Sequence, residues 1–192
     1  MAKIIIGLSG QIASGKEVVK KHLESRCGGV SFKFSDILRN ILDDLDVPTE
    51  RDNIIKLSTF LRQTYGEDLL AKVLTKQVKE AEDDLVIVDG IRRLADIEYL
   101  KDLDNFYLIA ITADLKIRYQ RVLSRNENPG DAEKTWEDFL ADEARETEVS
   151  ISAVVNQADY ILENNGTLEE LKNQIDKTLT LIQNERKETK NF

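Results

Sequence analysis

Short apolar runs alternate with longer amphipathic stretches along the whole chain. The runs are rich in branched and aromatic residues and end at turn-forming or charged residues, which is typical of strands. They occupy residues 3–8, 30–34, 85–88, 106–111 and 160–162. Strands that alternate with helices build parallel sheets covered on both faces. We therefore expect an α/β fold, with three α/β/α layers around a five-stranded, mainly parallel sheet.

The stretches between these runs place an apolar residue every three or four positions, as helices do. Helices are predicted over residues 17–23, 37–45, 94–103 and 114–124, over two segments between 54 and 78, from Ala132 or Lys134, and up to about Gln183. Ser35 or Asp36 is expected to cap the helix that follows it, and Thr167 to cap the last one.

The same pattern predicts one domain rather than several. This domain spans residues 1–184, with a helical insert at about 36–82 and a short lid at about 126–134. Residues 185–192 form a polar tail that we expect to fray. No internal repeat and no low-complexity segment divides the chain.

A glycine-rich segment joins the first predicted strand to the first predicted helix. A loop of this kind points its backbone N–H groups at phosphate oxygens, and its lysine reaches the β- and γ-phosphates of a nucleotide. The residues predicted to bind ATP in this way are Gly10, Gln11, Ile12, Ala13, Ser14, Gly15 and Lys16. A glycine-rich turn without a ligand is the alternative, and the agreement of strand, spacing, lysine and helix disfavours it.

The residue after the lysine departs from the usual loop. Ser or Thr is expected there, because its hydroxyl binds Mg²⁺, but this chain has Glu17. Either Glu17 binds Mg²⁺ directly or through water, or it points away along the helix. Asp89, directly after the third predicted strand, is the second predicted metal ligand. Its alternative role is to cap the next turn.

Arginines gather close to the predicted strand ends. Ligands of parallel sheets bind beyond these ends, and guanidinium groups match the charge that spreads over a transferring phosphoryl group. The arginines placed for this role are Arg39, Arg92, Arg93, Arg121 and Arg125. For Arg118, which shares a predicted helix with the last two, a solvated surface ion pair is the simpler interpretation.

Composition narrows the classes of partner. The net charge of −9 and the pI near 4.8 oppose non-specific binding to polymeric nucleic acid or to an anionic membrane. The single Cys27 excludes an internal disulfide and fits a reducing compartment. No apolar run approaches the ~20 residues of a membrane span. We expect a cytoplasmic protein, a monomer or homodimer, that acts on a small molecule.

The order of these motifs resembles the nucleoside monophosphate kinase group of P-loop proteins, which includes adenylate kinase and dephospho-CoA kinase. Residues 35–39, Ser-Asp-Ile-Leu-Arg, resemble the Gly-Asp-Met-Leu-Arg segment whose arginine holds the phosphate of the acceptor. Residues 89–93, Asp-Gly-Ile-Arg-Arg, resemble Asp-Gly-Phe-Pro-Arg, whose aspartate organises the metal and whose arginine also holds the acceptor. Arg121 and Arg125 match the two arginines at the entrance to the lid over ATP.

The last part of the chain, residues 158–171, is similar to the final strand and helix of dephospho-CoA kinases. The loop after that strand lies near adenine in those enzymes, which implicates Asn165 and Gly166 in nucleotide binding. Deoxynucleotide and phosphomevalonate kinases resemble this chain in placing an acid after the lysine of the loop.

The resemblance implies transfer of the γ-phosphoryl group of Mg-ATP to a small phosphate-bearing acceptor, with a nucleoside or deoxynucleoside monophosphate as first choice. The implied catalytic residues are Lys16, Asp89, Arg93, Arg121 and Arg125. The implied acceptor-binding residues are Ser35, Asp36, Arg39, Arg62, Arg92 and Arg93. A dephospho-CoA or phosphomevalonate kinase-like enzyme stays open as an alternative, and so does a non-catalytic ATP-binding regulatory module.

Overall fold

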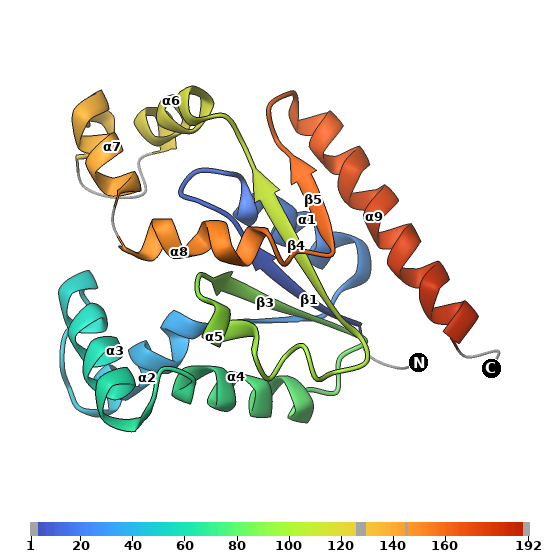
Figure 1. Ribbon diagram of the computed structural model, residues 1–192, viewed down its shortest axis with the longest axis horizontal. Coiled ribbons are helices and arrows are strands. Elements are labelled where there is room, and N and C mark those ends of the chain that lie inside the picture. Colours follow the sequence, from blue (N-terminus) through green and yellow to red (C-terminus); the bar gives the residue numbers. More distant parts are fainter. Residues whose placement is uncertain (1–3, 126–129, 145, 190–192) are drawn as a thin grey trace.

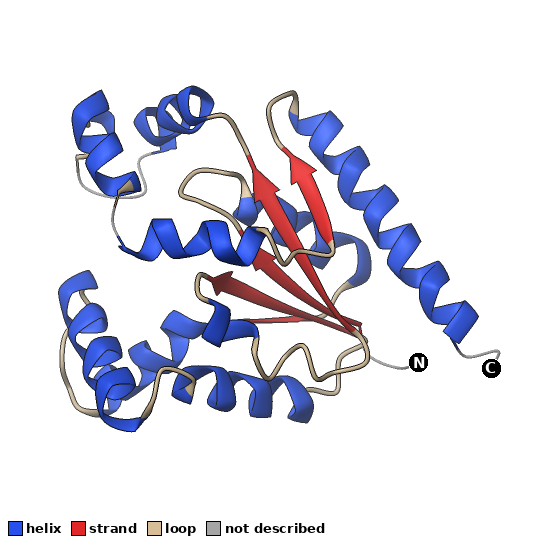
Figure 2. Ribbon diagram, in the orientation of Figure 1, coloured by secondary structure: helices blue, strands red, loops and turns tan. Residues whose placement is uncertain are grey.

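The computed structural model describes residues 4–125, 130–144 and 146–189. Strands and helices alternate along the chain, and helices flank the strands on both sides (Figure 2). The elements in chain order are β1 (Ile4–Ser9), α1 (Lys16–Cys27), β2 (Val30–Lys33), α2 (Phe34–Asp44), α3 (Arg51–Tyr65), α4 (Leu69–Glu80), β3 (Leu85–Ile91), α5 (Leu94–Ile97), β4 (Phe106–Thr112), α6 (Leu115–Arg125), the 3₁₀ turn η1 (Asp131–Glu133), α7 (Trp136–Glu143), α8 (Glu146–Val155), β5 (Tyr160–Glu163) and α9 (Leu168–Thr189).

The five strands form one sheet in the order β2-β3-β1-β4-β5, and every neighbouring pair is parallel. The predicted α/β fold with a five-stranded sheet is therefore confirmed. All strands end at the same side of the molecule, as Figure 1 shows. β1 lies in the middle of the sheet, so the loop that follows it is at the centre of the edge where parallel sheets bind ligands.

Two hydrophobic cores lie on opposite faces of the sheet, because successive residues of a strand point to opposite sides. Ile5 belongs to the core that α2 and α4 cover, whereas Ile4 and Ile6 belong to the core that α1 and α9 cover. All six residues of β1 are buried, as expected for a central parallel strand. The three layers predicted from the sequence are thus present.

The helical part after β2 contains three helices: α3 and α4 lie within the predicted insert, and α2 begins two residues before it. The break between α3 and α4 falls at Gly66, whose φ of 110° ends α3. This confirms the two predicted helices between residues 54 and 78. Thr167 also acts as predicted: its hydroxyl accepts from the N–H of Glu170, and the Glu170 carboxylate accepts from the N–H of Thr167.

The predicted start of α2 is wrong by three residues. α2 begins at Phe34, so Ser35 and Asp36 lie in its first turn, and no side chain caps the helix at Lys33. Phe34 is only 7% exposed and belongs to the core beneath α2. Helix formation from Phe34 onward therefore follows from tertiary packing of an apolar residue rather than from a capping side chain.

Other boundaries also differ from the predicted ones, and the helix predicted from Ala132 or Lys134 is α7, which begins at Trp136. β3 runs to Ile91, so Asp89 lies within the strand rather than after it. α5 ends at Ile97 instead of residue 103, because the chain turns before β4, where the N–H of Phe106 donates to the carbonyl of Leu103. α9 continues to Thr189 instead of ending near Gln183.

A hydrogen bond to β5 holds the part of α9 that extends beyond its predicted end. The hydroxyl of Tyr160 in β5 donates to the carboxylate of Glu185 at 2.7 Å, which ties the late turns of α9 to the sheet. α9 is helical as far as Thr189, residues 190–192 lie outside the described residues, and the predicted fraying of the tail stays a prediction. In the described part of the chain, no helix has both the length and the apolar character needed to cross a membrane.

Candidate functional site

The glycine-rich loop connects β1 to α1 and lies against the ends of β4 and β5. A Cβ atom on Gly10 would lie 2.4 Å from the carbonyl oxygen of Ile111, and one on Gly15 would lie 2.3 Å from Nδ2 of Asn164. No side chain fits in either place. Gly15 and Ala13 also have positive φ angles, of 109° and 57°. The two glycines are therefore what allows the loop to close against the neighbouring strands.

The amino group of Lys16, the first residue of α1, folds back over this loop. It donates hydrogen bonds to the carbonyl oxygens of Gly10 and Gln11, at 2.5 and 3.0 Å. The first backbone N–H groups of α1 add the partial positive charge of a helix N-terminus. Positive charge is thus concentrated at one point of a chain whose net charge is −9, and that arrangement suits a phosphate group.

Asn164, which follows β5, links the loop to α6. Its Nδ2 donates to the carbonyl oxygen of Ser14 at 2.8 Å. Its own carbonyl oxygen and its Oδ1 accept from Nη2 of Arg121, at 2.9 and 3.2 Å. The predicted site contained Asn165 and Gly166 but not Asn164. Only its place directly after a strand pointed to it, because an uncharged amide gives no further signal in a sequence.

Two buried polar atoms beside the loop have no hydrogen-bond partner among the described residues. They are the hydroxyl oxygen of Ser14 and Nη1 of Arg121. Burial also lowers the pKa of Arg121, because it disfavours the charged guanidinium. A buried donor without a partner costs about 1–3 kcal/mol, so native proteins rarely leave one unless a ligand or water fills the place. The residues of the loop therefore fit an anionic oxygen.

Arg125 lies at the base of the predicted lid. Its Nε donates to Oδ2 of Asp131 at 3.0 Å, and Asp131, in η1, is only 2% exposed. Residues 126–129 of the predicted lid lie outside the described residues. The part that the structure describes consists of Gly130, η1 and the start of the connection to α7.

Arg118 is buried, so its interpretation as a surface ion pair is wrong. It is 3% exposed, and both ends of its guanidinium donate to the carboxylate of Glu143 in α7, at 2.7 and 2.5 Å. Nη1 also donates to the carbonyl oxygen of Ile12 in the loop at 3.3 Å. The spacing held a signal: Arg118 is four residues before Val122, the other buried residue of α6, so both lie on one helix face.

The predicted metal ligands Asp89 and Glu17 each contact a lysine. Oδ2 of Asp89 lies 3.5 Å from Nζ of Lys33, its neighbour across the β2–β3 pair. The Glu17 carboxylate contacts Lys20 at 2.9 Å and Lys21 at 3.7 Å, so it is directed along α1.

Lys20 is 8% exposed, and sequence reasoning missed both this lysine and Lys33. Burial disfavours the ammonium of Lys20, but the carboxylates of Glu17 and Asp89 outweigh that effect and raise the pKa of Lys20. Burial likewise opposes the ionised form of Glu17, but the contact with Lys20 keeps the pKa of Glu17 below its ordinary value. Glu17 and Lys20 thus stabilise each other's charged forms.

A metal at this site must rely on few protein ligands. Among the residues whose side chains the structure describes, no three or more His, Cys, Asp or Glu side chains gather in a way that could hold a metal ion. Mg²⁺ in phosphate-transfer sites typically takes one or two carboxylates, with phosphate oxygens and water as the other ligands. Asp89, 8% exposed and close to the loop's strand, fits this donor set better than Glu17 does.

Among the predicted acceptor-binding arginines, Arg62 and Arg93 contact acids. Arg62 is 7% exposed, and its Nη2 donates to Oδ1 of Asp96 at 3.0 Å. Arg93 donates from Nη1 to Glu67 at 2.9 Å. The other oxygen of Asp96 accepts from the backbone N–H groups of Arg92 and Arg93, both at 3.0 Å. Asp96 therefore shapes the turn after β3 that carries these two arginines.

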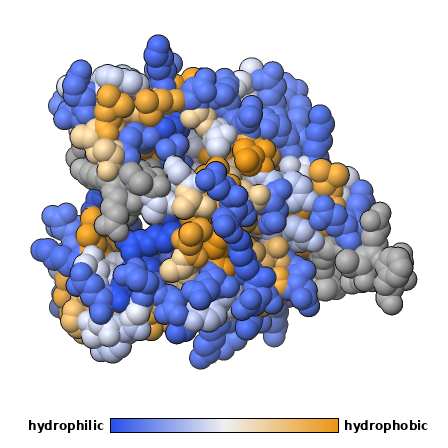
Figure 3. All heavy atoms as spheres, in the orientation of Figure 1, coloured by the Kyte–Doolittle hydropathy of each residue, from blue (hydrophilic) through white to orange (hydrophobic). Residues whose placement is uncertain are grey.

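The other predicted acceptor residues lie on α2. Arg39 and Asp36 are exposed and Ser35 is partly exposed. Figure 1 shows α2 and α3 on one side of the strand ends and α6 and α7 on the other. The molecule is hollowed between these two groups of helices, and hydrophilic side chains line the hollow (Figure 3). The roles of these residues toward an acceptor stay predictions.

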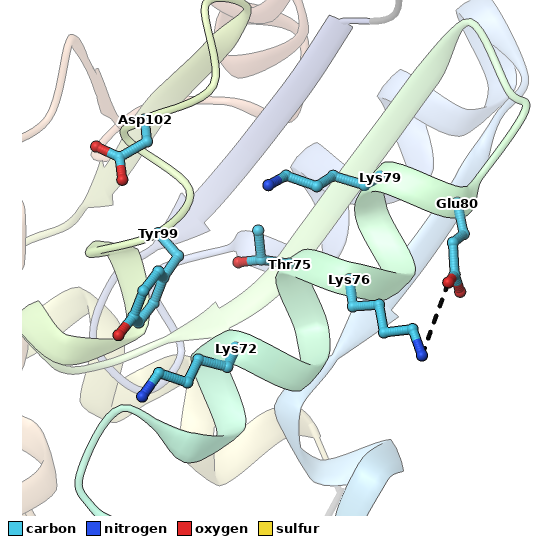
Figure 4. Close-up of a pocket in the computed structure, with 7 residues that line it drawn as sticks. All are labelled: Lys72, Thr75, Lys76, Lys79, Glu80, Tyr99 and Asp102. Carbon is cyan, nitrogen blue, oxygen red and sulfur yellow. Dashed lines mark ion pairs between the residues drawn. The ribbon is translucent and has the colours of Figure 1, made fainter.

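Two surface pockets lie beside other parts of the fold. One, of about 430 Å³, is bordered by α4 and the turn after α5 and contains no predicted site residue (Figure 4). Its Lys72 pairs with Asp68 and its Lys76 with Glu80, so these two ammonium groups are already neutralised. The other, of about 730 Å³, lies between β5 and α9 and is lined in part by Asn165 and Gly166. The predicted adenine-side residues therefore border an open hollow.

Comparison with known proteins places the chain in a family. Its sequence matches the AAA domain over residues 6–150. It is 30% identical to a UPF0200 protein of Staphylothermus marinus and 31% identical to one of Saccharolobus islandicus, in each case over 170 residues that cover 88% of both chains. This chain belongs to the UPF0200 family and carries an AAA domain. A UPF0200 protein of Methanococcus maripaludis is 29% identical over 182 residues, which are 94% of this chain and 98% of that protein.

Solved structures resemble this UPF0200 chain over nearly its whole length. TT1252 from Thermus thermophilus has a TM-score of 0.65 at 20% identity, and a shikimate kinase from Bacteroides thetaiotaomicron has 0.60 at 12%; each likeness covers 94% of this chain and 98% of the other. A dephospho-CoA kinase from Campylobacter jejuni has 0.54 at 18%, over 94% and 97%. At these identities the likeness concerns the fold, which is the predicted P-loop kinase fold.

Proposed function

We propose that this protein is an ATP-dependent phosphotransferase of the nucleoside monophosphate kinase type. It moves the γ-phosphoryl group of Mg-ATP to a small phosphate-bearing acceptor. The observation that carries this proposal is the pair of buried, unpartnered polar atoms, Ser14 Oγ and Arg121 Nη1, beside a loop that admits only glycine at two positions. Such atoms are satisfied by a ligand rich in hydrogen-bond acceptors.

Each residue of the site has a role in this reaction. Lys16 and the loop N–H groups hold the phosphates of the donor, Asn165 and Gly166 lie on its base side, and Glu17 takes part only as a metal ligand. Arg121 and Arg125 stabilise the charge that develops on the transferring group. Asp89, with Glu17 as the second predicted ligand, would hold Mg²⁺, which would neutralise charge on the phosphates. Positioning and charge account for the catalysis, so no covalent intermediate is required.

The preferred acceptor is a nucleoside or deoxynucleoside monophosphate. Its phosphate is assigned to Arg39 and to Arg92 and Arg93 after β3, with Ser35 and Asp36 nearby in the first turn of α2. Arg62 lies behind these residues and contacts Asp96. The same carboxylate accepts from the backbone N–H groups of Arg92 and Arg93. We place the protein in the cytoplasm, acting on small molecules as a monomer or homodimer.

A panel of acceptors tests the proposal. The protein is incubated with Mg-ATP and, in turn, the nucleoside and deoxynucleoside monophosphates, dephospho-CoA and phosphomevalonate, and steady-state ADP formation is followed. We expect one monophosphate to stimulate ADP formation well above the rate with ATP alone. If only dephospho-CoA or only phosphomevalonate stimulates ADP formation, that compound would be the acceptor instead. ATP binding without stimulation by any acceptor would contradict an enzymatic role and favour a regulatory module.

A further inference from the structure

Arg118, in α6, contacts both α7 and the phosphate loop, which comprises residues 10–16. The carboxylate of Glu143 holds both ends of its guanidinium, and its Nε donates to the carbonyl oxygen of Ala113 at 3.1 Å. The guanidinium also lies 5.7 Å from the centre of the Phe139 ring. Because Nε, Nη1 and Nη2 each donate a hydrogen bond, Arg118 is held in place and cannot reach a substrate without breaking the pair with Glu143.

One of these contacts reaches the loop backbone. Nη1 of Arg118 donates to the carbonyl oxygen of Ile12, 3.3 Å away and 106 positions earlier in the chain. The described residues contain no cis peptide bond, so the Ile12 carbonyl and the Ala13 N–H share a trans plane and point in opposite directions. A contact that holds this carbonyl toward the Arg118 guanidinium therefore directs the Ala13 N–H away from that guanidinium.

The next residue explains why such a contact is needed. Ala13 has φ 57°, the left-handed conformation that a residue with a Cβ atom rarely adopts. A strained backbone of this kind persists only where its surroundings determine it. The hydrogen bond from Arg118 opposes rotation of the Ile12–Ala13 peptide to a conformation that relieves Ala13.

Glu143 completes the arrangement. Its side chain is 11% exposed, and its Oε2 also accepts from Nε2 of Gln11 at 3.4 Å. Residues 11 and 12 of the loop are thus both connected to the end of α7 through one carboxylate and one guanidinium. A buried pair with additional hydrogen bonds at both ends fixes geometry more strongly than an exposed pair does.

We propose that Arg118 is a positioning residue for the phosphate loop: by holding the Ile12 carbonyl, it keeps the Ala13 N–H directed toward the bound polyphosphate. This inference rests on the proposed function, because a nucleotide must occupy the loop. Arg118 itself touches no substrate, and Glu143 sets the position of its guanidinium.

A double-mutant cycle between residues 118 and 13 tests the inference. The Kd of Mg-ADP is measured by calorimetry for wild type, Arg118→Met, Ala13→Gly and the double variant. We expect Arg118→Met to raise the Kd about tenfold, the size of one lost charge-assisted contact. Ala13→Gly should restore affinity in the Arg118→Met background by a larger factor than it changes wild type, because glycine adopts the left-handed conformation freely.

Further variants separate positioning from folding. Arg118→Met leaves the Glu143 carboxylate buried without its partner, so the cycle is repeated with Glu143→Gln, which removes that charge. Arg26→Met, an arginine of α1 whose side chain is 59% exposed and pairs with Asp176, is the matched control and should bind Mg-ADP as wild type does.

The outcomes are distinct. The inference is wrong if Arg118→Met binds Mg-ADP as tightly as wild type does. It is also wrong if Ala13→Gly fails to restore affinity preferentially in the Arg118→Met protein, both with Glu143 and with Glu143→Gln. In either case the proposed function stands. Failure of wild type to bind Mg-ADP overturns the proposed function, and the inference with it.

Discussion

Single side chains in this protein do more than their charge suggests. The neutral amide of Asn164 holds both the loop, through Ser14, and the cation Arg121. By contrast, the charged Glu17 pairs with two lysines of its own helix. What a side chain contributes to the site therefore follows from its position and hydrogen-bond geometry more than from its formal charge.

Replacing Lys16 with Ala removes the cation that lies over the loop. We expect turnover to fall at least ~100-fold, comparable to the loss of one preorganised donor to a developing charge, and Mg-ATP binding to weaken with it. Calorimetry and the ADP-formation assay measure the two effects. Lys172→Ala, an exposed lysine of α9, serves as the control. A Lys16→Ala protein that kept both properties would count against the site.

Asn164→Ala removes an amide that makes hydrogen bonds to both the loop and α6. It leaves the buried Ser14 carbonyl without this donor and Arg121 with one contact fewer. We expect the free energy of unfolding in urea to fall by about 2 kcal/mol, together with weaker Mg-ADP binding. Asn173→Ala, an exposed asparagine of α9, should change stability by less than about 0.5 kcal/mol. Equal effects of the two substitutions would show that Asn164 is not a structural link.

At the scale of elements, the strands were the easiest to predict because each is a short, buried apolar run whose signal is local. Helix limits were harder: packing of Phe34 started α2 early, and the contact of Tyr160 with Glu185 extended α9. These contacts join distant segments, and a local pattern contains no information on them.

The residues of the candidate site also fall into two groups, those with a local sequence signal and those without one. The loop residues were found because their spacing is local, within residues 10–16. Arg118 and Asn164 were not, since their loop partners lie 106 and 150 positions away. A buried role for a charged or amide residue becomes visible only when the fold brings its partner beside it.

The parallel pairing of β2 with β3 sets Lys33 opposite Asp89. Lys33 therefore competes with a divalent cation for this carboxylate. We expect Lys33→Met to lower the Mg²⁺ concentration that half-saturates ADP binding by about three- to tenfold, the effect of removing one nearby like charge. Titration of the ADP complex with Mg²⁺ measures the shift. Lys21→Met, an exposed lysine near Glu17, is the comparison, and a larger shift there would assign the metal to Glu17 instead.

The buried pair between Arg62 and Asp96 joins α3 to α5. Arg62→Met leaves the carboxylate of Asp96, which is 3% exposed, without its cation. Asp96 retains two backbone donors, so we expect a loss of about 3 kcal/mol in unfolding free energy. Urea denaturation measures it, with Lys56→Met on the exposed surface of α3 as the control. A loss no larger than that of the control would mean that the pair contributes little to stability.

For the whole molecule, the sheet order has a consequence during synthesis. The loop near the start of the chain is braced by Asn164, which a ribosome adds 150 residues after Ser14. β5, which carries Asn164 to its place, is the edge strand beside β4 and is the last of the five to be made. A nascent chain that has exposed only its first four strands thus holds the phosphate-binding sequence without its brace, and it should gain affinity for nucleotide only after β5 and Asn164 have been made.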